Sequence, residues 1–178
     1  MAGYLQKGIK NILQKHPNDI CILSAVRTPT CKSYKGGLKD AYDHELLATV
    51  HLPTLPHRPP RTNETLQVLR ATLARNPNLD PKLIQSVVVG TVLAELGGSK
   101  AGRMASLHAG IPHTSSFATV NRACASSLTA ITSLAHAMAA GEFDVGVAGG
   151  MESMTRNYGS KAIPTQLWDG LRESEDKD

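Results

Sequence analysis

The sequence predicts an α/β domain built on a mostly parallel sheet, and three observations support this fold class. Short runs of β-branched and other apolar residues alternate with longer segments of helical periodicity, and glycines separate the two. Strands that alternate with helices form right-handed βαβ units, in which the strands are parallel. The chain has 178 residues, enough for one sizeable core, and an aromatic content of 4% predicts an aliphatic interior.

Four apolar runs are expected to be strands of this sheet. They cover residues 20–26, 86–92, 116–120 and 144–148. The first run (ICILSAV) ends shortly before Pro29, and the last ends at the Gly149-Gly150 pair. The high content of Val and Ile is typical of strands that are buried on both faces.

Three helical segments are expected between the strands. They cover residues 43–47, 100–109 and about 124–140. Asp43 is placed to cap the first helix, and Gly141 ends the last.

Residues 50–67 interrupt the first of these helices. The segment has prolines at positions 53, 56, 59 and 60, which a helix interior does not accept. Without it, Leu47, Leu69 and Leu73 fall at i, i+4 and i+8 and form one apolar stripe. A proline-rich surface loop is the simpler interpretation. We favour a foreign insertion, a retained intron translated in frame, because valine codons begin with GT and one glutamine codon is CAG.

The composition argues against several classes of function. The net charge of +4 comes from basic residues scattered among acidic ones, which is not typical of nucleic-acid binding. The seven histidines show no metal-binding spacing, and no apolar run is long enough to span a membrane. Cys21, Cys31 and Cys124 have no CxxC spacing, which favours a reducing compartment over a disulfide framework.

Residues 1–18 are expected to be a basic N-terminal extension. Leu5, Ile9, Ile12 and Leu13 have the spacing of one helical face, and the first 15 residues contain three lysines and no acidic residue. The extension is either a surface helix packed on the domain or an organelle-targeting segment.

Residues 120–128 (VNRACASSL) carry the strongest chemical signal. Cys124 lies between a predicted strand and a predicted helix, where backbone N–H groups and the helix dipole stabilise a thiolate. Such a thiolate can attack a carbonyl carbon and hold the acyl group as a thioester. We therefore predict that Cys124 is a catalytic nucleophile at the carboxyl end of the sheet. The alternative is a structural cysteine, which is our interpretation of Cys21 and Cys31.

Three motifs, in the same order, resemble those of the thiolases (acetyl-CoA acyltransferases). Residues 121–128 (NRACASSL) are similar to the nucleophile motif N-R-x-C-S-S-G-L of that family. Residues 149–155 (GGMESMT) are similar to its G-G-x-E-S-M loop. Residues 26–29 (VRTP) and 35–40 (KGGLKD) are similar to its opening segment.

The resemblance implies a thiolase-like layered α/β/α N-terminal domain over residues 19–165, followed by the start of a loop domain at residues 166–178. It implies thiolytic cleavage of 3-ketoacyl-CoA in fatty-acid β-oxidation through an acyl thioester on Cys124. CoA would be a co-substrate, with no permanently bound cofactor and no metal, and the complete protein would be a homodimer. Residues 151–158 (MESMTRNY) most resemble fungal peroxisomal enzymes, so the expected location is the peroxisome, with the mitochondrion as alternative.

The chain also departs from the family pattern. Ala125 and Ser127 replace the usual Ser and Gly beside the nucleophile, which predicts a tighter pocket. The family places an asparagine, a histidine and a second cysteine in its C-terminal half, and none of those motifs occurs here; His108, His113 and His136 lie in no matching motif. We therefore expect an incomplete, N-terminal part of a thiolase that is inactive alone. Glu152 is expected to form structural hydrogen bonds rather than to act as a base.

Two other classes remain open. One is a non-catalytic thiolase fragment that binds CoA or caps a complete subunit. The other is the related group of condensing enzymes of fatty-acid and polyketide synthesis, against which the VRTP and ESMT residues argue.

Overall fold

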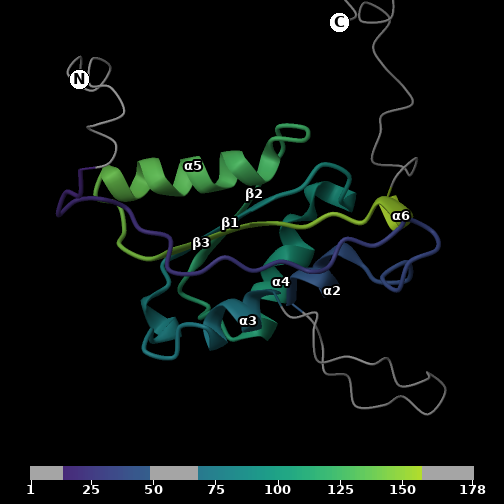
Figure 1. Cartoon of the computed structure of the whole chain (residues 1–178), viewed down its shortest axis with the longest axis horizontal. Helices are drawn as coiled ribbons and strands as arrows, with labels where there is room; N and C mark the ends of the chain where they lie inside the picture. The colour runs from purple at the N-terminus through teal and green to yellow at the C-terminus, as the bar shows by residue number, and fades with distance from the viewer. Residues whose placement is uncertain (1–13, 49–67, 158–178) are drawn as a thin grey trace, which may run out of the picture.

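The computed structural model describes residues 14–48 and 68–157, which form layers of helices around a three-stranded sheet (Figure 1). The strands are β1 (Ser86–Gly90), β2 (Ser116–Val120) and β3 (Gly146–Gly150). Both outer strands pair with β1 in parallel, in the order β2-β1-β3. The predicted α/β fold class with a parallel sheet is confirmed.

Helices cover both faces of this sheet. The helices are α2 (Asp43–Ala48), α3 (Val68–Ala74), α4 (Ser99–Ala109), α5 (Ser126–Ala139) and the short α6 (Met154–Asn157), with 3-10 turns η1 (Pro81–Leu83) and η2 (Glu95–Gly98). Among the described helices, α5 packs on one face of the sheet, whereas α4 covers the other together with α2 and α3 (Figure 1).

The two faces of the sheet carry side chains of different size. In β1, Val87 and Val89 point to the α4 face and are fully buried in the main apolar cluster. Val88 points to the α5 face with Gly90, whose backbone lies directly against Ser126 of α5. The strand register places Ala118 and Ala148 beside Val88. The α5 face is therefore lined with small residues, and α5 lies close to the strands.

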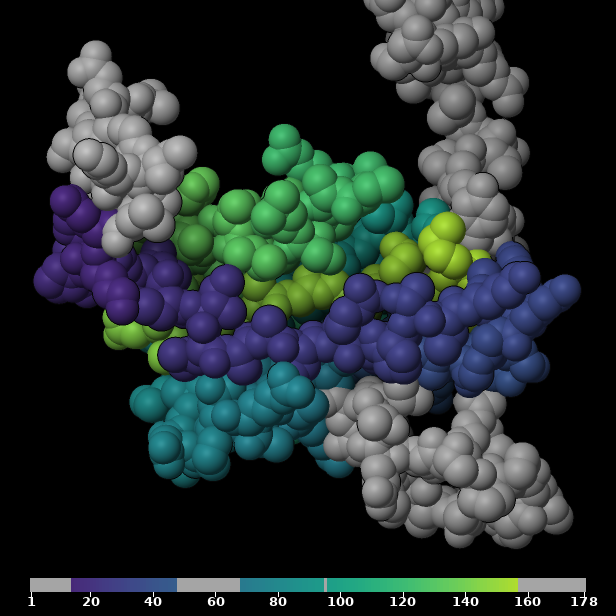
Figure 2. Space-filling model, in the orientation of Figure 1, coloured from purple at the N-terminus to yellow at the C-terminus, as the bar shows by residue number. Residues whose placement is uncertain are grey.

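The first predicted strand, residues 20–26, is absent from the sheet. Its Ile22 and Leu23 side chains are 76% and 68% exposed. Two side-chain hydrogen bonds from the turn after α3 hold it on the domain: Asn76 Nδ2 donates to Ser24 Oγ and Arg75 donates to the Ala25 carbonyl. The opening segment runs across the surface as an extended layer (Figure 2). The prediction was wrong because strand propensity requires a hydrogen-bonded neighbour, which this segment lacks among the described residues.

The other element bounds agree with prediction to within a few residues. The long helix begins at Ser126 rather than at Cys124, and β3 includes the two glycines that were expected to follow it. At the start of α2, Glu45 Oε2 accepts the Tyr42 N–H at 2.9 Å, as in a capping box, and Asp43 Oδ1 accepts the His44 N–H at 2.7 Å.

Several predictions concern residues outside the described ranges. These are the helix in the basic extension, the segment 50–67 and the loop domain at residues 166–178. On either side of the segment 50–67, α2 ends at Ala48 and α3 begins at Val68, and the two helices contact each other. The foreign insertion remains a proposal.

Candidate active site

Cys124 lies in the turn that joins β2 to α5, at the carboxyl end of the parallel sheet. Its thiol is free and the residue is exposed to solvent. Three residues separate it from the end of β2, and α5 begins two residues after it. The position between strand and helix that the sequence predicted is therefore present, and a thiol there is open to an incoming carbonyl compound.

The turn at Cys124 contains a residue in an unusual conformation. Ala123 has φ of 46°, in the left-handed region that alanine seldom adopts. Ser126 stabilises the turn from the helix side. Its Oγ accepts the Arg122 N–H at 2.8 Å and donates to the Ala123 carbonyl at 2.6 Å. Asn121 acts on the same turn from the strand side, so side chains hold the turn on both sides of Cys124.

Asn121 connects this turn to the neighbouring loop after β1. Its Oδ1 accepts the Ala123 N–H at 3.1 Å, and its Nδ2 donates to the Val92 carbonyl at 3.3 Å. Asparagine often bonds the backbone two residues further along in this way. The prediction from sequence did not single out Asn121, although its position just before the cysteine and this preference were both visible.

Glu152, in the GGMES loop after β3, fixes the same β1 loop from the other side. Its Oε2 accepts the N–H groups of Val92 at 2.8 Å and Leu93 at 3.2 Å. Its Oε1 is buried without a hydrogen-bond partner among the described residues. The carboxylate is therefore engaged by backbone N–H groups, which supports the expected structural role over that of a base.

Glycines at the strand ends let α5 approach the sheet at this site. A Cβ at Gly90 would meet the Ser126 carbonyl oxygen at 2.7 Å, and a Cβ at Gly150 would lie 3.1 Å from the Ser127 Cβ. Both are closer than ordinary contacts. Ser127, which replaces a glycine of the thiolase motif, is thus accommodated against Gly150.

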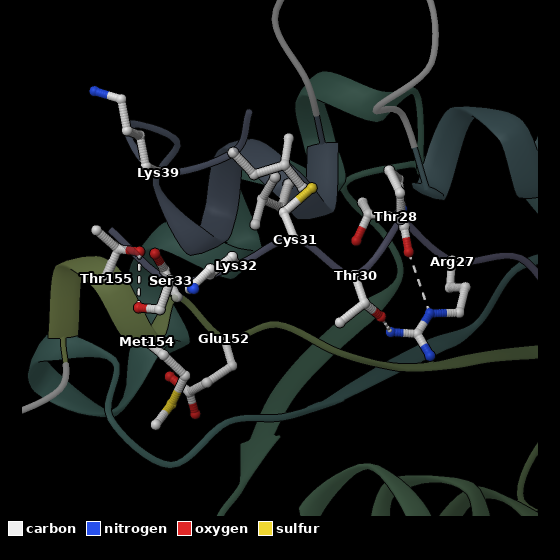
Figure 3. A pocket seen from close by; sticks show the side chains of 14 residues that line it. Arg27, Thr28, Thr30, Cys31, Lys32, Ser33, Lys39, Glu152, Met154 and Thr155 are labelled. Atoms are coloured by element: carbon white, nitrogen blue, oxygen red, sulfur yellow. Dashed lines mark hydrogen bonds between the residues drawn. The ribbon is translucent and has the colours of Figure 1, made fainter. Parts of the chain in front are cut away.

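The opening segment and the GGMES loop meet beside this site. Thr155 Oγ1 accepts the Tyr34 N–H at 3.1 Å and bonds Ser33 Oγ at 3.2 Å, and Ser153 Oγ donates to the Ala41 carbonyl at 3.3 Å. A shallow pocket of about 200 Å³ lies between them, with Glu152 in its wall (Figure 3). The opening segment and the GGMES loop are therefore in direct contact.

The described residues show no cluster of three or more His, Cys, Asp or Glu side chains that could hold a metal ion. No described helix is long and apolar enough to cross a membrane. Cys21 and Cys31, predicted as structural cysteines within or near a strand, are exposed. Since all three thiols are accessible to solvent, their relative reactivity depends on local chemistry rather than on burial.

Comparison with known proteins gives matches along most of the chain. The family model described as "Thiolase, N-terminal domain" matches residues 61–176. The peroxisomal 3-ketoacyl-CoA thiolase B of Candida tropicalis is 36% identical over 168 residues, which cover 94% of this chain and 36% of that protein. The chain thus spans about a third of the length of such curated relatives.

Solved structures show the same similarity. The dimeric peroxisomal thiolase of Saccharomyces cerevisiae superposes with a TM-score of 0.75 at 31% identity, over 92% of this chain and 38% of that one. The Acat5 thiolase from Ascaris suum in complex with coenzyme A gives a TM-score of 0.59 at 28% identity, over 82% of this chain and 32% of that one. The chain therefore belongs to the thiolase family, and its matched residues correspond to the N-terminal domain of that family.

Proposed function

We propose that Cys124 is the acyl-carrying nucleophile of a 3-ketoacyl-CoA thiolase. The observation that carries the proposal is the exposed, free thiol of Cys124 on a strand-to-helix turn within the NRACASSL motif. The family membership of residues 61–176 supports it, and so does the Candida relative, whose name states this activity.

The proposed reaction has two steps that share one thioester. The Cys124 thiolate attacks the 3-keto carbon, the bond between C2 and C3 breaks, and the electron pair leaves with the acetyl-CoA carbanion, which is protonated. The shortened acyl group stays on Cys124. CoA thiolate then attacks this thioester and leaves as shortened acyl-CoA, which regenerates the free cysteine.

The proton transfers require residues outside the motifs of this chain. By resemblance, the family supplies a histidine and a second cysteine from its C-terminal half, and those motifs do not occur in residues 1–178. Nucleophile and base act as a unit, so loss of the base costs nearly as much as loss of both. We therefore expect residues 1–178 alone to give no measurable thiolysis.

The location and partners of the complete protein follow from its relatives. The Candida relative is named peroxisomal, the yeast structure is a dimeric peroxisomal thiolase, and the Ascaris structure holds coenzyme A. We infer a peroxisomal enzyme of fatty-acid β-oxidation that forms a homodimer and uses CoA as a co-substrate, with no permanently bound cofactor.

The test measures alkylation and activity on the same protein. Iodoacetamide at limiting concentration, followed by mass spectrometry, should modify Cys124 faster than Cys21 and Cys31 because α5 begins two residues later. Cys21 and Cys31 are matched controls, since both are exposed. Equal or slower modification of Cys124 would refute its role.

An acetoacetyl-CoA cleavage assay completes the test. Cleavage by residues 1–178 that is lost in Cys124→Ala would refute the expected inactivity and would show a complete site in this chain. Fast alkylation without cleavage fits both the thiolase assignment and the alternative of a non-catalytic fragment. A binding measurement with CoA on the same sample distinguishes a CoA-binding fragment from one that only caps a subunit.

A further inference from the structure

The turn that carries Cys124 (residues 121–125) is connected to the loops after β1 and β3 by one chain of hydrogen bonds. Glu152 Oε2 accepts the Val92 N–H, the Val92 carbonyl accepts Asn121 Nδ2, and Asn121 Oδ1 accepts the Ala123 N–H. These contacts lead from the loop after β3, through the loop after β1, to the residue before Cys124. Each of the three loops therefore contributes one residue to the hydrogen bonds that hold the turn at Cys124.

The contact that matters most is the one to Ala123. With φ of 46°, Ala123 has a conformation that its Cβ disfavours, so the turn needs a compensating interaction to remain in place. Asn121 provides one, because Oδ1 accepts the N–H of Ala123 itself at 3.1 Å. Ser126 provides another on the carbonyl side of the same residue.

We propose that Asn121 is a positioning residue for Cys124, which it serves by holding Ala123 in the left-handed conformation against the loop fixed by Glu152. This proposal rests on the proposed role of Cys124 as the nucleophile. Asn121 does not touch the thiol in any hydrogen bond of the described residues. Its effect is on the direction in which the turn presents the thiol, beside the start of α5 two residues further along.

The test compares the alkylation rate of Cys124 with that of Cys31 in the same molecule, on the full chain of 178 residues. Asn121→Ala should lower this ratio about tenfold, the effect of a lost local hydrogen bond that orients a reactive group. Asn76→Ala is the matched control. It also removes two side-chain hydrogen bonds, to Ser24 and to the Thr72 carbonyl, but it lies outside the turn and should leave the ratio unchanged.

A second substitution separates positioning from general destabilisation. Glycine adopts positive φ without strain, so Ala123→Gly should remove the need for Asn121. The double variant Asn121→Ala with Ala123→Gly should recover the alkylation ratio to within about twofold of the unmodified chain. A merely structural role predicts no recovery, because glycine adds no contact. Absence of recovery would overturn the proposal.

The outcomes for the two proposals are distinct. If Cys124 in the unmodified chain reacts no faster than Cys31, the assignment of the nucleophile fails. If Cys124 is fast in the unmodified chain and equally fast in Asn121→Ala, only the role of Asn121 fails. Should Asn121→Ala not fold, as judged by circular dichroism, Asn121→Ser takes its place; its shorter side chain weakens both bonds and must still lower the ratio, about threefold.

Discussion

The two faces of the sheet differ in how completely the helices bury their side chains. On the α4 face, Val87 and Val89 are 0% exposed beneath helices that also pack on one another. On the α5 face, Val88 of the same strand is only partly buried, and Leu128 on α5 is 62% exposed. One face is a closed apolar core, whereas the other is a single helix that lies on small residues.

This difference indicates that one face of the sheet mainly stabilises the fold, whereas the other mainly positions the candidate site. The closed α4 face contains most of the buried apolar residues, so we expect it to supply most of the hydrophobic stabilisation. The α5 face positions Cys124 instead, because glycines at the ends of β1 and β3 bring the start of α5 against the sheet. Substitutions on the α4 face should therefore change stability, while those under α5 should also change the reactivity of Cys124.

Removal of residues 50–67 should give the largest effect on the α4 face. The deletion would join α2 directly to α3, which already contact each other, into one amphipathic helix on α4. We expect the free energy of unfolding to rise on the order of a few kcal/mol, measured by thermal denaturation. A transcript that retains the segment in every read, together with no gain in stability, would identify it as a genuine part of the protein.

Gly90→Ala tests the close approach of α5. The new Cβ would meet the Ser126 backbone, so α5 must shift, at a cost of about 2–3 kcal/mol. Gly149→Ala is the control, because nothing lies within 4 Å of its Cβ, and it should change stability by less than about 0.5 kcal/mol. Chemical denaturation measures both. Slower alkylation of Cys124 should accompany only Gly90→Ala; equal effects of the two variants would contradict the close packing.

Val89→Ala and Val88→Ala compare the two faces directly within one strand. Val89 is fully buried and Val88 is not, so we expect losses of about 2 kcal/mol and about 1 kcal/mol respectively. Urea unfolding curves with equal m-values would give the difference. Equal losses would mean that something covers the α5 face in solution.

The sequence predicted those parts of the fold that depend on neighbouring residues. The β-branched run in β1 and the glycine at position 110 after α4 mark their elements locally. The segment 20–26 has the same local pattern as β1 and yet forms no strand, because pairing depends on a partner far along the chain. Local signals therefore identified candidates for strands but not which of them pair.

Some features of the candidate site could likewise be predicted from the sequence, and others could not. Cys124 was recognisable from its motif and its place before a helix. The contacts of Glu152 with the N–H groups of Val92 and Leu93 join residues about sixty positions apart, so no spacing rule could reveal them. The left-handed conformation of Ala123 was equally hidden, since alanine carries no sequence signal for positive φ.

The central place of β1 has a consequence for synthesis on the ribosome. β1 is made first, but its partners β2 and β3 begin about thirty and sixty residues later, and Met151 of the apolar cluster follows β3. At ordinary rates of elongation, several seconds pass between the appearance of β1 and that of β3. During this interval the valine-rich β1 has both edges unpaired in the nascent chain, and unpaired strand edges are the features of a folding chain that favour aggregation.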